Sequence, residues 1–508
     1  MTRAAAEIGA GLASAREARA IVPGERIHVI GVGGAGASAA AILARAAGAN
    51  VSGCDPGGPS PYTPAVEAAG IPVAWRHDPG HVTTEPRPDR VAVTKALTAV
   101  APDHPELAAA RRAGTPLEPW HQVVADAAVG RTLVAVAGTH GKSTTSGWLV
   151  HVLAEAGRDP SAFVGALLPP ALTGGIAATA RLGAGAPFIV EADEYAGNFD
   201  PYRPAVAVVT NVEWDHPDVF ADLDATLAAF EGWLLAAAER EPAPALVINV
   251  GDAGGARLRA RLAAWRGPIV EVDVTEGPEA QPGSALPTPA RLLARILGAD
   301  AAGTTIVLSG GGLASPLGVR LATAGRHNVA NAVAVAGAAL ALEVRPADIA
   351  RGLATFPGVG RRLERLGEAR GVTVYDDYGH HPTAIAATLA AVRQREPGRR
   401  IWAVYEPLTY HRTAAMLDAF AEVLATADAV AIADIWAGRD PDTTVASAEG
   451  LASAIRRRRP AMVAEAPGSV DATAAWLAGR VGHDDAVLVM GGGRSYRIGP
   501  LLLEALRR

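Results

Sequence analysis

The feature that most constrains this chain is a short glycine turn that carries a lysine and a serine, Gly-Thr-His-Gly-Lys-Ser at residues 138–143. It follows an apolar run and opens an apolar, helix-like segment. In a strand–turn–helix of this kind, the backbone N–H groups at the helix start face an anion. Lys142 adds a positive charge, and Ser143 offers a hydroxyl ligand for Mg²⁺. The turn has two residues between its glycines, Thr139 and His140, where a standard Walker A loop has four. We therefore predict that the chain uses ATP or a relative, the alternative being a glycine turn beside a chance Lys-Ser pair.

The length and composition exclude several classes of protein. At 508 residues the chain is too long for one core and is expected to hold roughly three domains. Its net charge of −6 offers no basic field for nucleic acid. The single cysteine, Cys54, excludes an internal disulfide and a cysteine-based zinc site, and it suits a reducing cytosol. The sequence shows no signal peptide and no apolar stretch of about twenty residues, so we expect a cytoplasmic protein without membrane insertion.

Apolar strands alternate with helical stretches along the chain, which predicts α/β units on mostly parallel sheets. Strand–glycine–helix openings occur near residue 30, at the phosphate loop, and near residue 490. The breaks between these units predict three domains, at residues 1–131, 132–344 and 345–508.

The first opening matches G-x-G-x-x-G through Gly31, Gly33 and Gly36, and Asp55 follows the next expected strand. In a dehydrogenase such an acid binds the adenine ribose. The motif alone does not separate a dinucleotide from a UDP-sugar, because either pyrophosphate fits the same helix N-terminus. A glycine turn that serves packing alone is a third interpretation.

Acidic residues follow two apolar strands in the middle of the chain. One strand ends in Glu191, Asp193 and Glu194, and the other is followed by a segment that includes His216. Ligands of α/β sheets bind at this edge, and Mg²⁺ prefers a few carboxylates together with phosphate oxygens. We therefore favour metal binding over a solvated acidic loop.

Two later segments complete the set of candidate sites. Asn328 and Asn331 lie one helical turn apart, where their amides can read an adenine edge or merely cap the helix. The segment from Phe356 to Thr383 gathers arginines, acids and two histidines around an expected strand end. This density of charge is typical of a site for phosphate or carboxylate.

Taken together, these motifs resemble the Mur ligases of peptidoglycan synthesis, and most of all the branch that adds L-alanine to UDP-N-acetylmuramate. The resemblance covers residues 27 to 383 in family order and weakens toward the C-terminus. The segments that carry it are IHVIGVGGAGAS, VAVAGTHGKSTT, FIVEADEY, VAVVTNVEWDH, GRHNVANA, FPGVGRRLE and VYDDYGHHPT.

The resemblance implies an N-terminal Rossmann-like UDP-sugar-binding domain, a central ATP-binding domain on a parallel or mixed sheet, and a C-terminal Rossmann-like domain that binds the amino acid. ATP would phosphorylate the lactyl carboxylate of UDP-N-acetylmuramate, and the amine of L-alanine would attack the acyl phosphate. Monomer and homodimer both stay open.

The resemblance also implies residue roles. The expected catalytic residues are Lys142, Glu194, His216, Arg362 and His380. One Mg²⁺ would bind Ser143 and Glu194, and a second would bind Glu194 and His216. The expected ATP contacts are Gly138, Thr139, His140, Gly141, Lys142, Ser143, Thr144, His327, Asn328, Asn331 and Asp377. The expected substrate contacts are Gly33, Gly34, Gly36, Asp55, His381 and Arg412.

The chain departs from the family pattern in the third domain, which selects the amino acid. Leu408 stands where the family has a histidine, and a histidine appears instead at His411. Gly493-Arg494 replaces the end of a glycine turn that normally closes with aspartate. These changes weaken the expectation that the chain is specific for L-alanine.

Several rival functions are therefore carried forward. The nearest is a murein-peptide recycling ligase, which joins L-Ala-γ-D-Glu-meso-diaminopimelate to the same nucleotide sugar. A folylpolyglutamate-synthetase-like ligase is disfavoured by the N-terminal glycine loop. An NAD-dependent oxidoreductase leaves the phosphate loop without a purpose. A non-catalytic nucleotide-sugar sensor would be expected to lack Lys142, Glu194 or His216.

Overall fold

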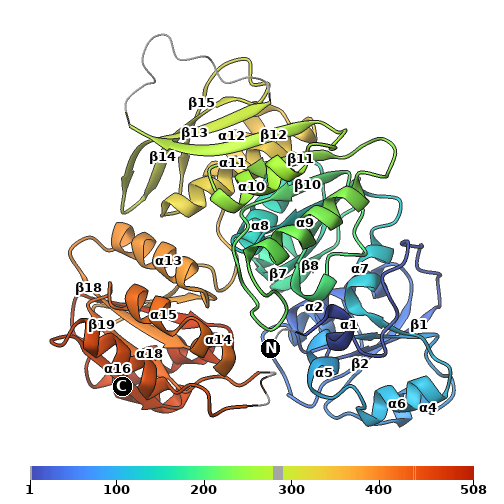
Figure 1. The fold of residues 1–508 in the computed structure, drawn as a ribbon, viewed down its shortest axis with the longest axis horizontal. Coiled ribbons are helices and arrows are strands. Elements are labelled where there is room, and N and C mark those ends of the chain that lie inside the picture. Colours follow the sequence, from blue (N-terminus) through green and yellow to red (C-terminus); the bar gives the residue numbers. More distant parts are fainter. Residues whose placement is uncertain (1–2, 278–289, 439, 441) are drawn as a thin grey trace.

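A computed structural model describes residues 3–277, 290–438, 440 and 442–508 of the chain, and it contains three sheets, each the centre of one unit (Figure 1). The predicted three-domain α/β architecture is confirmed. Among the described residues, no helix combines the length and the apolar character needed to cross a membrane.

The N-terminal unit is a five-stranded parallel sheet in the order β3-β2-β1-β4-β5. The strand order reverses beside β1, the position where open α/β sheets bind ligands. Its strands are β1 (Arg26–Ile30), β2 (Asn50–Cys54), β3 (Val73–Ala74), β4 (Arg90–Val93) and β5 (Leu117–Pro119). Its helices are α1 (Ala5–Ile8), α2 (Ala35–Ala46), α3 (Thr63–Ala68), α4 (Gly80–Thr83), α5 (Lys95–Val100), α6 (Pro105–Arg112) and α7 (Trp120–Ala127).

The central unit has a ten-stranded sheet in the order β15-β14-β13-β12-β11-β10-β6-β9-β7-β8. Strands β6, β9, β10 and β11 run parallel and are largely buried, which is why they read as continuous apolar runs. Strand β12 continues the parallel order but is only partly buried. The strands are β6 (Thr132–Ala137), β7 (Ser161–Leu168), β8 (Ala178–Arg181), β9 (Pro187–Glu191), β10 (Val206–Val209), β11 (Ala245–Asn249), β12 (Ile269–Glu276), β13 (Arg291–Asp300), β14 (Gly303–Gly310) and β15 (Leu317–Leu321). The helices are α8 (Lys142–Glu155), α9 (Leu223–Ala237), α10 (Ala253–Arg261), α11 (Arg326–Ala341) and α12 (Pro346–Ala354).

The C-terminal unit has a six-stranded sheet in the order β16-β17-β21-β18-β19-β20, antiparallel only between β16 and β17. The strands are β16 (Glu364–Ala369), β17 (Val372–Asp377), β18 (Arg400–Glu406), β19 (Ala429–Ala433), β20 (Val463–Gly468) and β21 (Asp485–Gly491). The helices are α13 (Pro382–Arg395), α14 (Tyr410–Ala415), α15 (Leu417–Leu424), α16 (Ala448–Arg458), α17 (Val470–Ala478) and α18 (Ile498–Arg507).

Helix α12 belongs by its packing to the central unit. Ile349 and Leu353 lie in the same buried cluster as the apolar side chains of α8 and α11. The first element of the C-terminal sheet is therefore β16, some twenty residues after the expected boundary. The division of the chain at residues 131 and 344 stays a prediction.

The C-terminal unit docks on the central one through the end of α13 (Figure 1). The Gln394 amide donates to the Asp300 and Gly303 carbonyls, at 3.0 and 3.1 Å, and accepts from Gly325 N–H at 2.8 Å. Because Gly325 precedes α11, this one side chain ties the third unit to the start of a helix that lines the central cavity.

Adding a side chain should affect stability differently at two helical glycines, Gly36 in α2 and Gly232 in α9. A Cβ on Gly36 would lie 2.1 Å from the Trp120 ring, whereas one on Gly232 in α9 would meet nothing. We expect Gly36→Ala to destabilise the protein by about 1–3 kcal/mol through overpacking. Gly232→Ala should raise stability by up to about 1 kcal/mol, because alanine favours a helix. Thermal unfolding of both variants checks this, and equal midpoints would contradict it.

Candidate active site

The phosphate loop is held open by residues that follow β10. Its two glycines, Gly138 and Gly141, have φ angles of 139° and 78°, which favour glycine. His140 N–H donates to Asn211 Oδ1 at 2.8 Å, and Thr139 Oγ donates to the Glu213 carbonyl at 3.1 Å. The first backbone N–H groups of α8 are thereby presented at the carboxyl edge of the sheet, as an anion site requires.

Lys142 lies among carboxylates at the start of α8. Its Nζ donates to Glu194 Oε2 at 3.0 Å and to the Gly138 carbonyl at 2.6 Å, and lies 3.6 Å from Asp193. Burial lowers the pKa of Lys142, but these carboxylates outweigh it and hold the pKa above its ordinary value. Burial raises the pKa of Glu194 to about 7, against the attraction of Lys142. The Lys142 cation therefore lies next to the Glu194 carboxyl group, whose pKa is close to neutral pH.

The expected metal ligands divide into two neighbouring groups. Carboxylate and ring atoms of Asp193, Glu194 and His216 lie within 4.8 Å of one another. The Ser143 hydroxyl instead donates to Glu191 Oε1 at 3.0 Å. Two acids, a histidine and a nearby hydroxyl are hard or borderline donors that suit Mg²⁺ beside a phosphate. The structure thus brings Glu194 and His216 together as expected, and it places Asp193 and Glu191 from the same acidic strand end beside them.

Arg362 reaches the phosphate loop from the segment that leads into the C-terminal sheet. Its guanidinium donates to the Ser143 hydroxyl at 2.9 Å and lies 5.1 Å from the centre of the Tyr378 ring. Its buried Nε makes no hydrogen bond within the described residues. A guanidinium with an unused donor at a phosphate loop is well placed for a phosphate oxygen.

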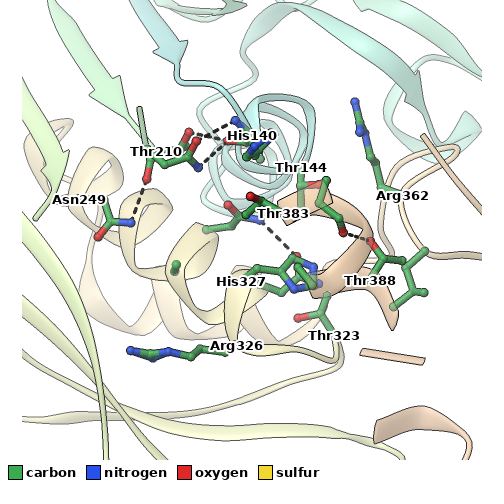
Figure 2. A pocket seen from close by; sticks show the side chains of 18 of the residues that line it. His140, Thr144, Thr210, Asn249, Thr323, Arg326, His327, Arg362, Thr383 and Thr388 are labelled. Carbon is green, nitrogen blue, oxygen red and sulfur yellow. Dashed lines mark hydrogen bonds between the residues drawn. The ribbon is translucent and has the colours of Figure 1, made fainter. Parts of the chain in front are cut away.

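A cavity of about 450 Å³ extends from the phosphate loop between the central and C-terminal units. In Figure 2, His140 and Thr144 lie at one end, and Thr323 and His327 at the other. Burial lowers the pKa of His327 to about 4, so its ring is neutral at pH 7. The cavity is also lined by Asn328, Asn331 and Asp377.

The two asparagines are engaged with each other in this structure. Asn331 Nδ2 donates to Asn328 Oδ1 at 3.2 Å, and Asn328 Nδ2 donates to the Ala324 carbonyl at 2.8 Å. Asp377 accepts backbone N–H groups from Leu363 and Gly379 on its two oxygens, at 2.8 and 2.7 Å. Asp377 therefore shapes the wall of the cavity through the backbone.

A second cavity, of about 650 Å³, joins all three units. Gly31 and Asp55 line it from the first unit, Lys142 and His216 from the second, and His380 from the third. The phosphate loop borders both cavities. Lys142 lines the three-unit cavity, and His140 and Gly141 of the same loop line both cavities.

The residues expected to bind substrate at the first glycine loop have different surroundings. Asp55 lines the three-unit cavity, and its Oδ2 accepts Gly33 N–H at 3.0 Å. Gly34 caps α2, where the free N–H groups of a helix start lie. Gly36 faces Trp120 instead, so its lack of a side chain serves packing.

The third-unit residues surround an acid that the sequence prediction omitted, Asp215. The Arg412 guanidinium donates to Asp215 Oδ1 at 2.5 Å and lies 3.2 Å from His216 Nδ1. His380 is held by the Tyr378 carbonyl at 2.9 Å, and burial lowers its pKa well below the ordinary value. Arg412 thus supports the His216 loop, in addition to lining the cavity.

Glu213 is the other functional side chain that the prediction omitted. It contacts His140 Nε2 at 3.2 Å and accepts from the Thr383 hydroxyl at 2.8 Å. It therefore links the phosphate loop to the first turn of α13. Its place after an apolar strand was visible in the sequence, but its partner on α13 lies 170 residues away.

Comparisons with known proteins match the chain over nearly its whole length. Three family models match consecutive parts of the chain: the Mur ligase family catalytic domain at residues 26–132, the Mur ligase middle domain at 136–339, and the Mur ligase glutamate ligase domain at 361–493. A UDP-N-acetylmuramate–L-alanine ligase of Kineococcus radiotolerans is 39% identical over 95% of this chain and 96% of its own length.

Solved structures give the same fold. The UDP-N-acetylmuramate–alanine ligase of Thermotoga maritima is 23% identical, with a TM-score of 0.73 over 94% of this chain and 98% of that one. A murein peptide ligase of Psychrobacter arcticus is 26% identical, with a TM-score of 0.70 over 96% of this chain and 99% of that one.

His381 gives the site a pH dependence of stability. Burial lowers its pKa from 6.5 to about 4, while its Nδ1 caps α13 by accepting Thr383 N–H. Below pH 6.5 the unfolded chain binds a proton that the folded chain does not, so stability falls as the pH drops from 6.5 toward 4. Asparagine also caps a helix but does not titrate. Between pH 7 and pH 5, we expect the wild type to lose about 2 kcal/mol more than His381→Asn.

Urea denaturation of both proteins at the two pH values measures this difference. Parallel losses in the wild type and in His381→Asn would show that His381 is not the titrating group.

Proposed function

The chain belongs to the Mur ligase family, and we propose that it joins L-alanine to UDP-N-acetylmuramate in an ATP-dependent reaction of peptidoglycan precursor synthesis. Curated relatives with this activity in their names match nearly the whole chain at 34–39% identity. The observation that carries the proposal is the convergence of the phosphate loop, Asp55 and His380 on one cavity beside Lys142.

In this reaction two anions must meet, the lactyl carboxylate and the γ-phosphate of ATP. We assign the ATP phosphates to the loop at residues 138–144, whose N–H groups at the start of α8 attract them. Lys142 and the Nε of Arg362 supply positive charge at the same place. Preorganised charges of this kind stabilise a transition state without having to reorient.

We assign a Mg²⁺ site to Asp193, Glu194 and His216, with Ser143 and Glu191 beside them. When bound there, the ion would neutralise phosphate charge and hold the transferred group in line. Without it, Glu194 shares its charge with Lys142.

The adenine is assigned to the 450 Å³ cavity, where His327, Asn328 and Asn331 come from the first turns of α11. The uridine end of the sugar nucleotide is assigned to the edge of the first sheet, at Gly33, Gly34 and Asp55. Gly36 supports this site by packing on Trp120.

The amine is assigned to the third unit. His380 and Arg412 line the three-unit cavity from there, together with Leu408, His411 and Trp436. Leu408 pairs with Trp436 through a β-bridge, so an apolar wall stands where the family has a polar residue. A small apolar amino acid suits such a wall. After formation of an acyl phosphate on the lactyl carboxylate, attack by the amine would release phosphate and leave an amide.

The phosphate loop provides a direct test. We expect Lys142→Ala to lower phosphate release with UDP-N-acetylmuramate, ATP and L-alanine by at least about a hundredfold, the loss that follows from removing one preorganised charge. Thermal unfolding and calorimetric binding of UDP-N-acetylmuramate control for an intact fold. An alanine variant that releases phosphate at a near-normal rate would refute the assigned role.

The amine site provides the second test, which separates the proposed activity from peptide recycling. We expect a higher kcat/KM for L-alanine than for L-Ala-γ-D-Glu-meso-diaminopimelate, with L-serine weaker. Glycine should be disfavoured by about 10- to 200-fold, because one methyl group adds little binding energy. Phosphate release with each amine gives the ratios. A ratio of alanine to tripeptide below one would assign the chain to the recycling branch, with the ATP site unchanged.

A further inference from the structure

A second cluster of metal-ligand side chains lies in the N-terminal unit. Five residues from separate elements meet at the carboxyl end of the first sheet: His28 on β1, Cys54 at the end of β2, His77 before α4, His81 on α4, and Glu106 on α6. Of these, only His77 lines the three-unit cavity. No step of the proposed ligase reaction uses this cluster.

The other four side chains are packed around Glu106. Its Oε1 lies 3.3 Å from His28 Nε2 and 2.9 Å from His81 Nδ1, and its Oε2 lies 3.2 Å from His77 Nδ1. Cys54 Sγ lies 3.4 Å from His28 Nε2 and 3.5 Å from Glu106 Oε2. Ligand atoms of His28, Cys54, His81 and Glu106 all lie within 4.8 Å of one another.

The separations among His28, Cys54 and Glu106 are close to the edges of a zinc tetrahedron. Bond lengths of about 2.0–2.1 Å for nitrogen or oxygen and about 2.3 Å for sulfur give edges of roughly 3.3 Å between two light ligands, and roughly 3.6 Å from either to sulfur. The distances from His28 to Glu106 and from Cys54 to Glu106 agree with these edges. His81 Nδ1, now 2.9 Å from Glu106 Oε1, would move away from that oxygen to reach the same edge length.

The orientation of His28 suits a ligand. Its Nδ1 lies 2.9 Å from the Ser52 hydroxyl, which can accept the ring proton and leave the Nε2 lone pair directed at the cluster. An outer hydrogen bond of this kind fixes the tautomer of metal-binding histidines. His77 contacts the second oxygen of Glu106 and so helps to orient that carboxylate.

Burial and charge also favour a cation. Cys54 and Glu106 are fully buried, and apolar residues such as Ile30, Val82 and Leu107 surround them. Within the described part of the chain, Glu106 is ion-paired only with histidines. A thiolate and a carboxylate together would carry two negative charges, which one divalent ion neutralises.

We propose that His28, Cys54, His81 and Glu106 form a site for a zinc-type divalent ion, with His77 orienting Glu106. A single cysteine excludes only a site built from several cysteines, and this donor set is mixed. The ion would tie β1, β2, α4 and α6 together. It would also fix the end of β2, where Asp55 follows Cys54 and holds the first glycine loop through Gly33.

The presence of one cysteine in the whole chain makes the test specific. The full-length protein is treated with chelator and titrated with Co²⁺. We expect a thiolate-to-cobalt charge-transfer band that saturates at one equivalent and is displaced by Zn²⁺. Cobalt at the Asp193–Glu194–His216 group cannot give this band, because that group lacks sulfur. The readout requires neither ATP nor ligase activity, so it is independent of the proposed function.

Four variants complete the experiment. Cys54→Ser should abolish the band, while His81→Asn and Glu106→Gln should weaken Co²⁺ binding at least tenfold, about the loss that follows from removing even an outer partner. The exposed His483 serves as the matched control, and His483→Asn should leave binding unchanged. His81 is partly exposed, so His81→Asn is the variant least expected to disturb folding.

Zn²⁺ should also raise the melting temperature of the stripped wild type but not that of Cys54→Ser. Absence of the band in folded wild type would overturn the proposal. A band that His81→Asn and Glu106→Gln leave unchanged would overturn it as well, because the thiolate would then bind cobalt without the predicted partners.

Discussion

The structure of the site depends on the balance of charge around Lys142. This cation is buried at the start of α8, where the helix dipole also contributes positive charge, and the acids at the end of β9 compensate it. An unpaired charge of either sign would be costly in such a place. The same balance suits ligand binding. A phosphate group can replace the carboxylates as the partner of Lys142, and a metal cation can replace Lys142 as the partner of the carboxylates.

The C-terminal unit completes the site by contacts at both ends of the 450 Å³ cavity. At the phosphate end, Arg362 bonds Ser143, and Glu213 joins His140 to Thr383. At the far end, Gln394 bonds the backbone before α11. These contacts join polar groups, and interfaces between domains of one chain are generally compatible with relative movement of the domains.

The structure places two departures from the family pattern, Leu408 and Gly493, next to Trp436. Leu408 packs beside Trp436 at the edge of the three-unit cavity, and a Cβ on Gly493 would collide with the same tryptophan. His411 is largely exposed and bonds Asp440. Leu408 and Trp436 thus supply apolar lining to the three-unit cavity, which His411 and Asp440 also border.

The sequence by itself determined the three α/β units, the phosphate loop, the acidic strand ends and the family, because these features are encoded in short segments with a strand–turn–helix pattern. Only the tertiary structure decided which side chains meet. It paired Ser143 with Glu191, placed Gly36 against Trp120, and extended the central packing through α12. It also gathered Cys54 with histidines from two other segments, β1 and the start of α4. Such contacts join residues tens to hundreds of positions apart, and their geometry follows from the packing of whole sheets and helices, which no local pattern records.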